Sequence, residues 1–242
     1  TSGKGNVAIG KWAAYYTKVG EYNSYFNYAG SNREDGDHNI AIGLYALKGS
    51  ETAADNYGGG NIALGQNAGC RITTGGCNII MGYNAMSVGS VTSHNNVAIG
   101  KCAGLNLTSG EDNILLGAHT GMNLRTCSDN IFLGDYAGRG GTSEGSHSSI
   151  GIGKQTLMKT EGCYDIAIGE EAGRCHTSGT ANIFLGRYAG KCVTTGSDNI
   201  ALGRKSLGDS AGTTGNYNFA AGYSTGEAIT SGEHNVLLGY FA

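Results

Sequence analysis

Hydrophobic and polar residues follow a short phrase that recurs along the whole chain. The phrase opens with Asn, continues with an apolar, a variable and a second apolar residue, and closes with Gly, as in NIALG at 61–65 and NIFLG at 182–186. Fourteen copies occur, and successive copies most often start 17 residues apart. So short a period is typical of a solenoid, in which each repeat is one coil that buries its apolar side only by stacking on its neighbours. The pattern therefore predicts an all-β, parallel β-solenoid of about 14 coils, which fills residues 1–242 as a single domain.

Each position of the repeat, numbered from the first residue of the phrase, has its own composition. Position 1 is Asn in twelve coils, with Ser149 and Asp165 as the exceptions, and we expect its amides to form a hydrogen-bonded ladder. Positions 2 and 4 are apolar nearly throughout, and because alternate residues of a strand share one face, we expect them to fill the coil interior. Position 5 is Gly in every coil except at Asn27, which predicts a corner where φ is positive.

Position 3 carries no charged residue in any coil, although it should then point outward. An apolar stripe on the outside needs a cover, and we expect another copy of the chain to supply it. The residues expected at this interface are Ala8, Tyr25, Ala63, Ile80, Leu115, Phe132, Phe184 and Leu237. The alternative is that a second strand of the same coil covers the stripe.

Composition and charge agree with a continuous sheet and exclude some partners. The chain has 44 Gly and no Pro, and Pro would remove a ladder hydrogen bond from any coil that contained it. The net charge of −3 argues against a nucleic-acid partner, and no apolar run is long enough for membrane insertion. Both ends fall inside the repeat, so we expect a segment of a longer fibre protein or an uncapped unit capable of end-to-end self-stacking.

Charged residues at position 6 favour a structural role over a catalytic one. Successive coils carry Asp135, Lys154, Glu170, Arg187 and Arg204, which predicts pairing of opposite charges on a solvent-exposed face. Asp135 and Glu170 also suggest the carboxylate pair of a glycosidase, but Lys154 stands between them. We therefore expect no catalytic residues, and the sequence shows no motif for a cofactor or a metal.

Histidine and cysteine offer little further chemistry. The six His are scattered, and we expect ordinary surface roles for them. The seven Cys cannot all pair, although Cys175 and Cys192 occupy the same position in successive coils and could be bridged.

The repeat is interrupted at residues 12–28, where seven aromatic residues gather, and by an insertion at 48–60. The aromatic segment predicts either a glycan-binding patch or a joint to another domain. Smaller excursions occur at 138–148 and 208–217, and loops of this kind are candidates for contact with a receptor. The residues expected to contact a cell-surface receptor or glycan are Trp12, Tyr15, Tyr16, Tyr22 and Tyr57.

The phrases NVAIG at 6–10 and 96–100, NIAIG at 39–43 and NIALG at 61–65 resemble the head repeats of trimeric autotransporter adhesins. Similar phrases occur in viral and phage fibre proteins. The resemblance implies a left-handed β-roll, three chains around a common axis, and a location outside the cell or on a virion surface. The period here is longer than in that family, which adds loop to each coil.

Taken with the residues, the resemblance implies a non-enzymatic structural or adhesive segment of a trimeric extracellular or virion (tail) fibre. The alternative is a subunit of a self-assembling extracellular β-solenoid filament. A glycan-depolymerising enzyme is a less favoured third.

Overall fold

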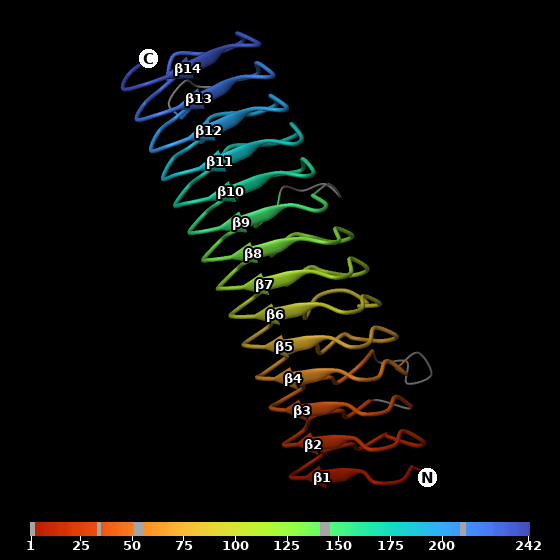
Figure 1. Cartoon of the computed structure of the whole chain (residues 1–242). Helices are drawn as coiled ribbons and strands as arrows, with labels where there is room; N and C mark the ends of the chain where they lie inside the picture. Colours follow the sequence, from red (N-terminus) through yellow and green to blue (C-terminus); the bar gives the residue numbers. More distant parts are fainter. Residues whose placement is uncertain (1–2, 33–34, 51–55, 141–145, 209–211) are drawn as a thin grey trace. The chain divides into compact units, whose positions relative to one another are not determined.

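The computed structural model describes residues 3–32, 35–50, 56–140, 146–208 and 212–242 (Figure 1). The backbone groups into two compact units, residues 1–126 and residues 127–242, which are described separately below. Among the described residues, no helix has the length and apolar character needed to cross a membrane. The single-domain organisation expected from the repeat stays a prediction.

Both units consist of three-residue strands, one in each repeat, joined by turns. The first unit contains β1 (Val7–Ile9), β2 (Ser24–Phe26), β3 (Ile40–Ile42), β4 (Ile62–Leu64), β5 (Ile79–Met81), β6 (Val97–Ile99) and β7 (Ile114–Leu116). The second contains β8 (Ile131–Leu133), β9 (Ile150–Ile152), β10 (Ile166–Ile168), β11 (Ile183–Leu185), β12 (Ile200–Leu202), β13 (Phe219–Ala221) and β14 (Val236–Leu238).

Within each unit, every strand pairs in parallel with the next strand along the chain, and equal positions of the repeat lie side by side. In the first unit Ala41 is opposite Ala63, and in the second Phe184 is opposite Ala201. Figure 1 shows the strands of each unit following one another in chain order. The predicted all-β parallel solenoid with a spacing of about 17 residues is therefore confirmed. The left-handed sense of the roll stays a prediction.

The prediction that positions 2 and 4 fill the interior is wrong, because position 3 does so. Tyr25, Phe132 and Phe184 are among the largest fully buried side chains. The flanking residues of the same strands are half-buried or exposed. A three-residue strand places its middle side chain on one face and its outer two on the other. Here the remainder of the coil folds over the middle residue, with Ala at position 8 and residues such as Leu107 and Ile72 completing the core.

Large residues at position 3 fit because glycine makes room for them within the same chain. A Cβ atom on Gly138 would overlap the Phe132 ring, and one on Gly151 would lie 2.7 Å from its Cδ1 atom. A Cβ atom on Gly190 would overlap the ring of Phe184 in the same way. The mixture of large and small groups therefore interdigitates inside each unit and not between copies of the chain.

Position 5 and position 1 shape the corners of the coil as expected. Gly100 has a φ of +136°, and a Cβ atom there would overlap the carbonyl of Gly117, so the corner admits no side chain. Asn27 replaces this Gly with a φ of +54°, a conformation that Asn tolerates better than most residues. At position 1, Asn61 Oδ1 accepts the backbone N–H of Asn78 at 3.0 Å, which confirms the predicted ladder.

Candidate functional site

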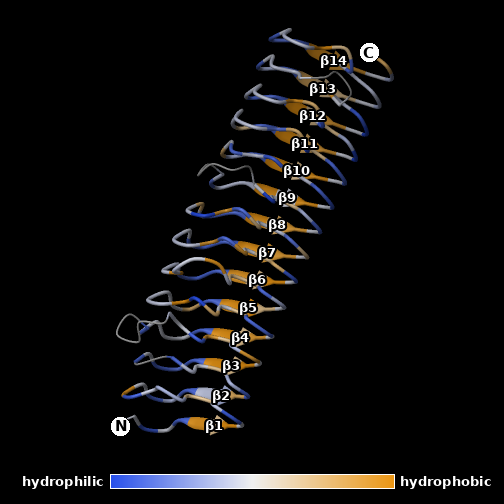
Figure 2. Ribbon diagram, turned by 180° about the vertical axis from the view of Figure 1, so that it is seen from behind, coloured by the Kyte–Doolittle hydropathy of each residue, from blue (hydrophilic) through white to orange (hydrophobic). Residues whose placement is uncertain are grey.

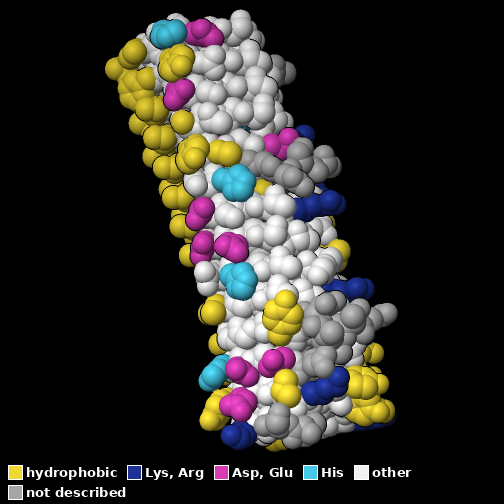
Figure 3. Space-filling model, turned by 90° about the vertical axis from the view of Figure 1, so that its right-hand side faces the viewer, with side chains coloured by type: hydrophobic (Ala, Val, Ile, Leu, Met, Phe, Trp, Pro, Cys, Tyr) yellow, Lys and Arg dark blue, Asp and Glu magenta, His cyan; other side chains and the backbone are white. Residues whose placement is uncertain are grey.

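Positions 2 and 4 form an apolar face on each unit instead of a core. In the first unit Ile40, Ile79 and Ile114 are 41%, 38% and 39% exposed. In the second unit Ile168 is 42% and Leu185 37% exposed. Figure 2 shows these strands as hydrophobic stretches, and in Figure 3 hydrophobic side chains follow one edge of the view. Exposed apolar residues that recur in this way make the face a candidate interaction surface.

The residues predicted at an interface between chains lie elsewhere. Six of them are buried inside their own coils, namely Tyr25, Ala63, Ile80, Leu115, Phe132 and Phe184. The other two belong to β1 and β14, where Ala8 is exposed and Leu237 half-buried. The stripe is thus covered within one chain, and its prediction as an intermolecular surface is corrected: the neighbouring positions 2 and 4 carry the exposed apolar groups.

Three of the predicted glycan-contact residues meet in the turns of the first coil. The Trp12 and Tyr15 ring centroids are 4.4 Å apart with an interplanar angle of 75°, and those of Tyr15 and Tyr16 are 4.5 Å apart at 77°. The column continues into the next two coils, because Tyr28 lies 6.2 Å from Trp12 and 4.9 Å from Tyr45. We call Trp12, Tyr15, Tyr16, Tyr28 and Tyr45 the aromatic corner.

A cavity of about 440 Å³ opens at this corner. It is lined by Trp12, Tyr15, Tyr16, Tyr28, Ser31, Asn32, Tyr45 and Lys48. Its volume is within the range of small-molecule sites. A smaller hollow of about 160 Å³ shares Tyr45 and Lys48 with it and adds Arg71.

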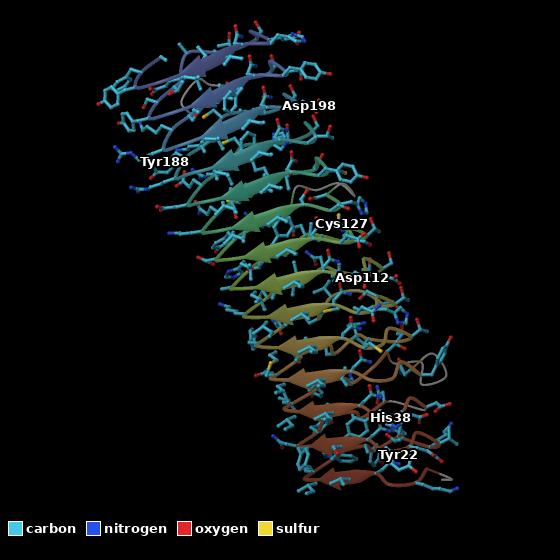
Figure 4. The ribbon with its side chains drawn as sticks, in the orientation of Figure 1. Tyr22, His38, Asp112, Cys127, Tyr188 and Asp198 are labelled. Carbon is cyan, nitrogen blue, oxygen red and sulfur yellow. The ribbon has the colours of Figure 1, made fainter. Side chains whose placement is uncertain are left out.

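The other two predicted contact residues lie apart from the aromatic corner. Tyr22 precedes β2 and stacks on His38 with centroids 5.4 Å apart, at the turn that enters the strands (Figure 4). Tyr57 lines an open hollow of about 660 Å³ together with Asp35, Asp37 and His38. Residues 51–55 of the predicted contact loop lie outside the described residues, as do 141–145 and 209–211 of the two smaller excursions.

The residues predicted to contact a ligand did not include Tyr28, Tyr45 or Lys48, although Tyr28 and Lys48 belong to the two interruptions of the repeat. Tyr45 holds position 7 of its coil, as Trp12 does, so aligning the turns as well as the strands reveals the pair. Tyr28 escapes that alignment because its coil is one residue shorter at the Asn27 corner.

The predicted charge pairing at position 6 is confirmed at one step. Arg187 Nε lies 2.8 Å from Glu170 Oε2, with both side chains about half exposed. Glu171 holds position 7 of its coil. Its Oε2 atom contacts Lys191 at 3.1 Å and Arg174 at 3.2 Å. Burial tends to raise the pKa of Glu171, but these two cations outweigh it and lower the pKa. The pair of Arg187 and Glu170 is exposed and contributes modest energy, whereas the contacts of Glu171 are half-buried.

One histidine overturns the expectation of surface roles. His176 is fully buried, at a position where other coils have Ile72, Leu107 or Val193. Its Nε2 atom lies 3.2 Å from Oδ2 of Asp165, whose side chain is also fully buried. The two unusual residues therefore occur in the same coil and contact each other.

The surroundings of His176 favour the imidazolium form. Nδ1 lies 3.2 Å from the carbonyl oxygen of Val193, and Nε2 lies 2.9 Å from that of Gly179. Because both nitrogens face acceptors, both must carry protons for the contacts to be favourable. Burial by itself lowers the pKa of His176, but the hydrogen bond and charge of Asp165 and the two carbonyls raise it overall. The second oxygen of Asp165, Oδ1, accepts the backbone N–H of Asn182 at 2.9 Å, so the pair is part of the ladder.

No disulfide joins any of the seven described cysteines, and Cys175 and Cys192 are not bridged in the structure. Burial raises the pKa of Cys70, although Arg71 and Lys48 act against it. Among the described residues, no group of three His, Cys, Asp or Glu side chains is arranged to hold a metal ion.

No protein-family model, curated protein or solved structure matches the chain.

Proposed function

We propose that the chain is a non-enzymatic structural segment of a homotrimeric fibre that acts outside the cell or on a virion surface. The observation that carries the proposal is the apolar face at positions 2 and 4. In water this face costs free energy, since burial of apolar surface is worth about 25 cal/mol per Å². A structural segment that associates through this face removes it from water.

A further copy of the chain is the partner that best fits this face. Neighbouring strands lie about 4.8 Å apart, so the apolar groups repeat at that interval along each unit. A partner that fills the grooves between them must repeat at the same interval, and another copy of the same face does so. Three copies around one axis also agree with the adhesin-like phrases of the sequence. Association through position 3 is not part of the proposal, because Phe132 and its equivalents are buried.

Mass measurement with paired variants tests the proposal. Ile166→Asp with Ile183→Asp places two charges on the apolar face, at position 2 of β10 and β11. Burial of unpaired carboxylates is strongly unfavourable, so we expect this variant to lose the trimer mass by light scattering. The control is Tyr164→Asp with Ala181→Asp, one residue before the Asn position of the same coils, where both residues are exposed. Asp112 and Asp198 occupy that position in other coils with positive φ, so the control should fold and stay trimeric.

The outcomes separate the proposal from its rivals. A wild-type chain that is monomeric at micromolar concentration, or a face variant that keeps the trimer mass and the far-UV circular dichroism of the wild type, contradicts it. Fibres of indefinite length in electron micrographs favour the filament instead. Turnover of a polysaccharide that disappears in Asp135→Asn and Glu170→Gln variants favours the enzyme.

A further inference from the structure

We propose that the cavity at the aromatic corner binds an acidic carbohydrate, a site that the structural role does not require. The cavity combines ring surfaces, a buried hydroxyl group and a cationic rim, all contributed by the first three coils. Each of these features corresponds to one part of such a ligand.

The rings supply the surface on which a sugar stacks. Trp12 is 39% exposed, and Tyr15 and Tyr16 are each 54% exposed. Exposed aromatic groups of this size are costly unless a ligand covers them. Their edge-to-face arrangement covers a ring with only the rim of its neighbour, which leaves ring face open. The C–H groups on one side of a pyranose carry partial positive charge, and the negative face of an aromatic ring attracts them.

The hydroxyl group of Ser31 indicates that the ligand is polar. Ser31 lines the cavity and is only 4% exposed, yet its Oγ has no hydrogen-bond partner. A buried polar atom without a partner costs about 1–3 kcal/mol and calls for an explanation. A sugar hydroxyl that enters the cavity would supply the missing hydrogen bond.

The charge at the rim indicates that the sugar is acidic. Lys48 is the one charged side chain among the described residues that line the cavity, and its Nζ lies 5.4 Å from the Tyr45 ring centroid. Lys11 Nζ lies 5.9 Å from the Trp12 ring centroid, and Arg71 lines the adjoining hollow beside Lys48. Three cations thus lie at or beside the aromatic corner, although the chain as a whole has a net charge of −3. A carboxylate or sulfate on the sugar would form charge-assisted hydrogen bonds with them.

The chain contains its own probe for this test, because Trp12 is its single tryptophan and lines the cavity. Tryptophan fluorescence is titrated with three hexasaccharides: one carboxylated (from hyaluronan), one sulfated (from heparin) and one neutral (maltohexaose). We expect at least one acidic hexasaccharide to change the fluorescence with saturation, and maltohexaose to bind at least tenfold more weakly. Comparing the two acidic probes identifies the preferred acidic group.

Calorimetry on variants then locates the binding. Tyr45→Ala and Trp12→Ala should each weaken binding at least tenfold, and Lys48→Gln should weaken it and reduce its dependence on salt. Tyr188→Ala is the matched control, because Tyr188 holds the same position 7 in the second unit, and it should bind like the wild type. Retained far-UV circular dichroism shows that each variant is folded.

The proposal is overturned if no acidic hexasaccharide binds at millimolar concentration, or if binding survives both Tyr45→Ala and Trp12→Ala. Equal binding of maltohexaose overturns the acidic requirement. If no sugar binds and Trp12→Ala changes the mass of the assembly, the corner is a protein contact. Because the trimer is read from mass and the sugar site from binding, either proposal can fail without the other.

Discussion

The two units build the position-1 ladder differently. In residues 1–126 position 1 is Asn in every coil. From Asn6 to Asn96, each side chain accepts a hydrogen bond from the next coil and donates one across its own coil, as Asn96 Nδ2 does to the Gly110 carbonyl at 3.0 Å. In residues 127–242 two successive coils lack Asn, because Ser149 and Asp165 take its place.

In the coil of Asp165, other groups make both connections of the Asn side chain. Asp165 keeps the acceptor for the next coil but has no donor for Gly179, which is the counterpart of Gly110. His176 Nε2 reaches Gly179 instead, at 2.9 Å, and neutralises the carboxylate at 3.2 Å. An amide is thus replaced by an ion pair that makes the same two connections. We therefore expect the two replacements to depend on each other, and the predictions below test that coupling.

The largest effect is expected from His176→Leu. The variant restores the apolar residue of other coils but leaves the Asp165 carboxylate buried without a cation. Removing one partner of a buried ion pair costs about 3–5 kcal/mol. Hydrogen exchange should show faster exchange of the Asn182 amide, which donates to Asp165, with little change in the first unit.

The double variant Asp165→Asn with His176→Leu is the control for this result. It recreates the Asn-and-leucine arrangement of the first unit, and well-packed apolar replacement of a buried pair is often neutral or stabilising. We expect protection of the Asn182 amide to return to the wild-type level or above. Equal losses in the single and double variants would show that the two residues are not coupled.

A transfer of the pair into the first unit sharpens the comparison. Asn96→Asp alone should destabilise its coil by about 3–5 kcal/mol, as an unpaired buried carboxylate does. Adding Leu107→His, at the position equivalent to His176, should recover about 1–3 kcal/mol of that loss. Exchange of the Asn113 amide, which donates to Asn96 Oδ1 at 3.0 Å, reports on both. If the double variant loses more free energy of unfolding than the two single variants lose together, the pair needs features particular to the second unit.

The ion pair should also make the second unit sensitive to alkaline pH. The pKa of His176 is raised in the folded chain, so its stabilisation is complete below the unfolded value of about 6.5. That stabilisation is lost as the pH rises from the unfolded to the folded-state pKa, by about 1.4 kcal/mol per pH unit. Between pH 6 and pH 10, the Tm should therefore fall more steeply for the wild type than for the double variant Asp165→Asn with His176→Leu. Parallel curves would show that His176 does not titrate in this range.

The sequence predicted the fold from its period, but it could not assign the two faces of the strand. Both faces of the strand are apolar, although only one of them packs inside the coil. The alternation of residues therefore does not show which face is buried. Only the structure assigns the two faces: it places Gly138 against the ring of Phe132 and Gly190 against that of Phe184, inside one chain.

The candidate site was predicted in part for a similar reason. Trp12, Tyr15 and Tyr16 lie next to one another in sequence, so their clustering was visible, whereas Tyr45 joins them only through the stacking of coils. The pairing of His176 with Asp165 was also readable, because the one coil with Asp at position 1 is the one with His at position 12. Counting histidines without assigning them to coil positions concealed it.

The smallest effect is expected from Ser149→Asn, which repairs the other gap in the second ladder. Ser149 Oγ accepts a hydrogen bond from the Asp165 amide at 3.2 Å. This distance is longer than the 2.9 Å between the Asn182 amide and Asp165 Oδ1. An Asn side chain would reach further toward the Asp165 amide and could also donate across its own coil, as Asn96 does. One additional hydrogen bond is worth about 0.5–1.5 kcal/mol, so the Asp165 amide should exchange about threefold to tenfold more slowly. Ser149→Ala is the control that removes the acceptor and should accelerate the same exchange. Slower exchange in both variants would mean that packing, and not the ladder acceptor, limits stability at this coil.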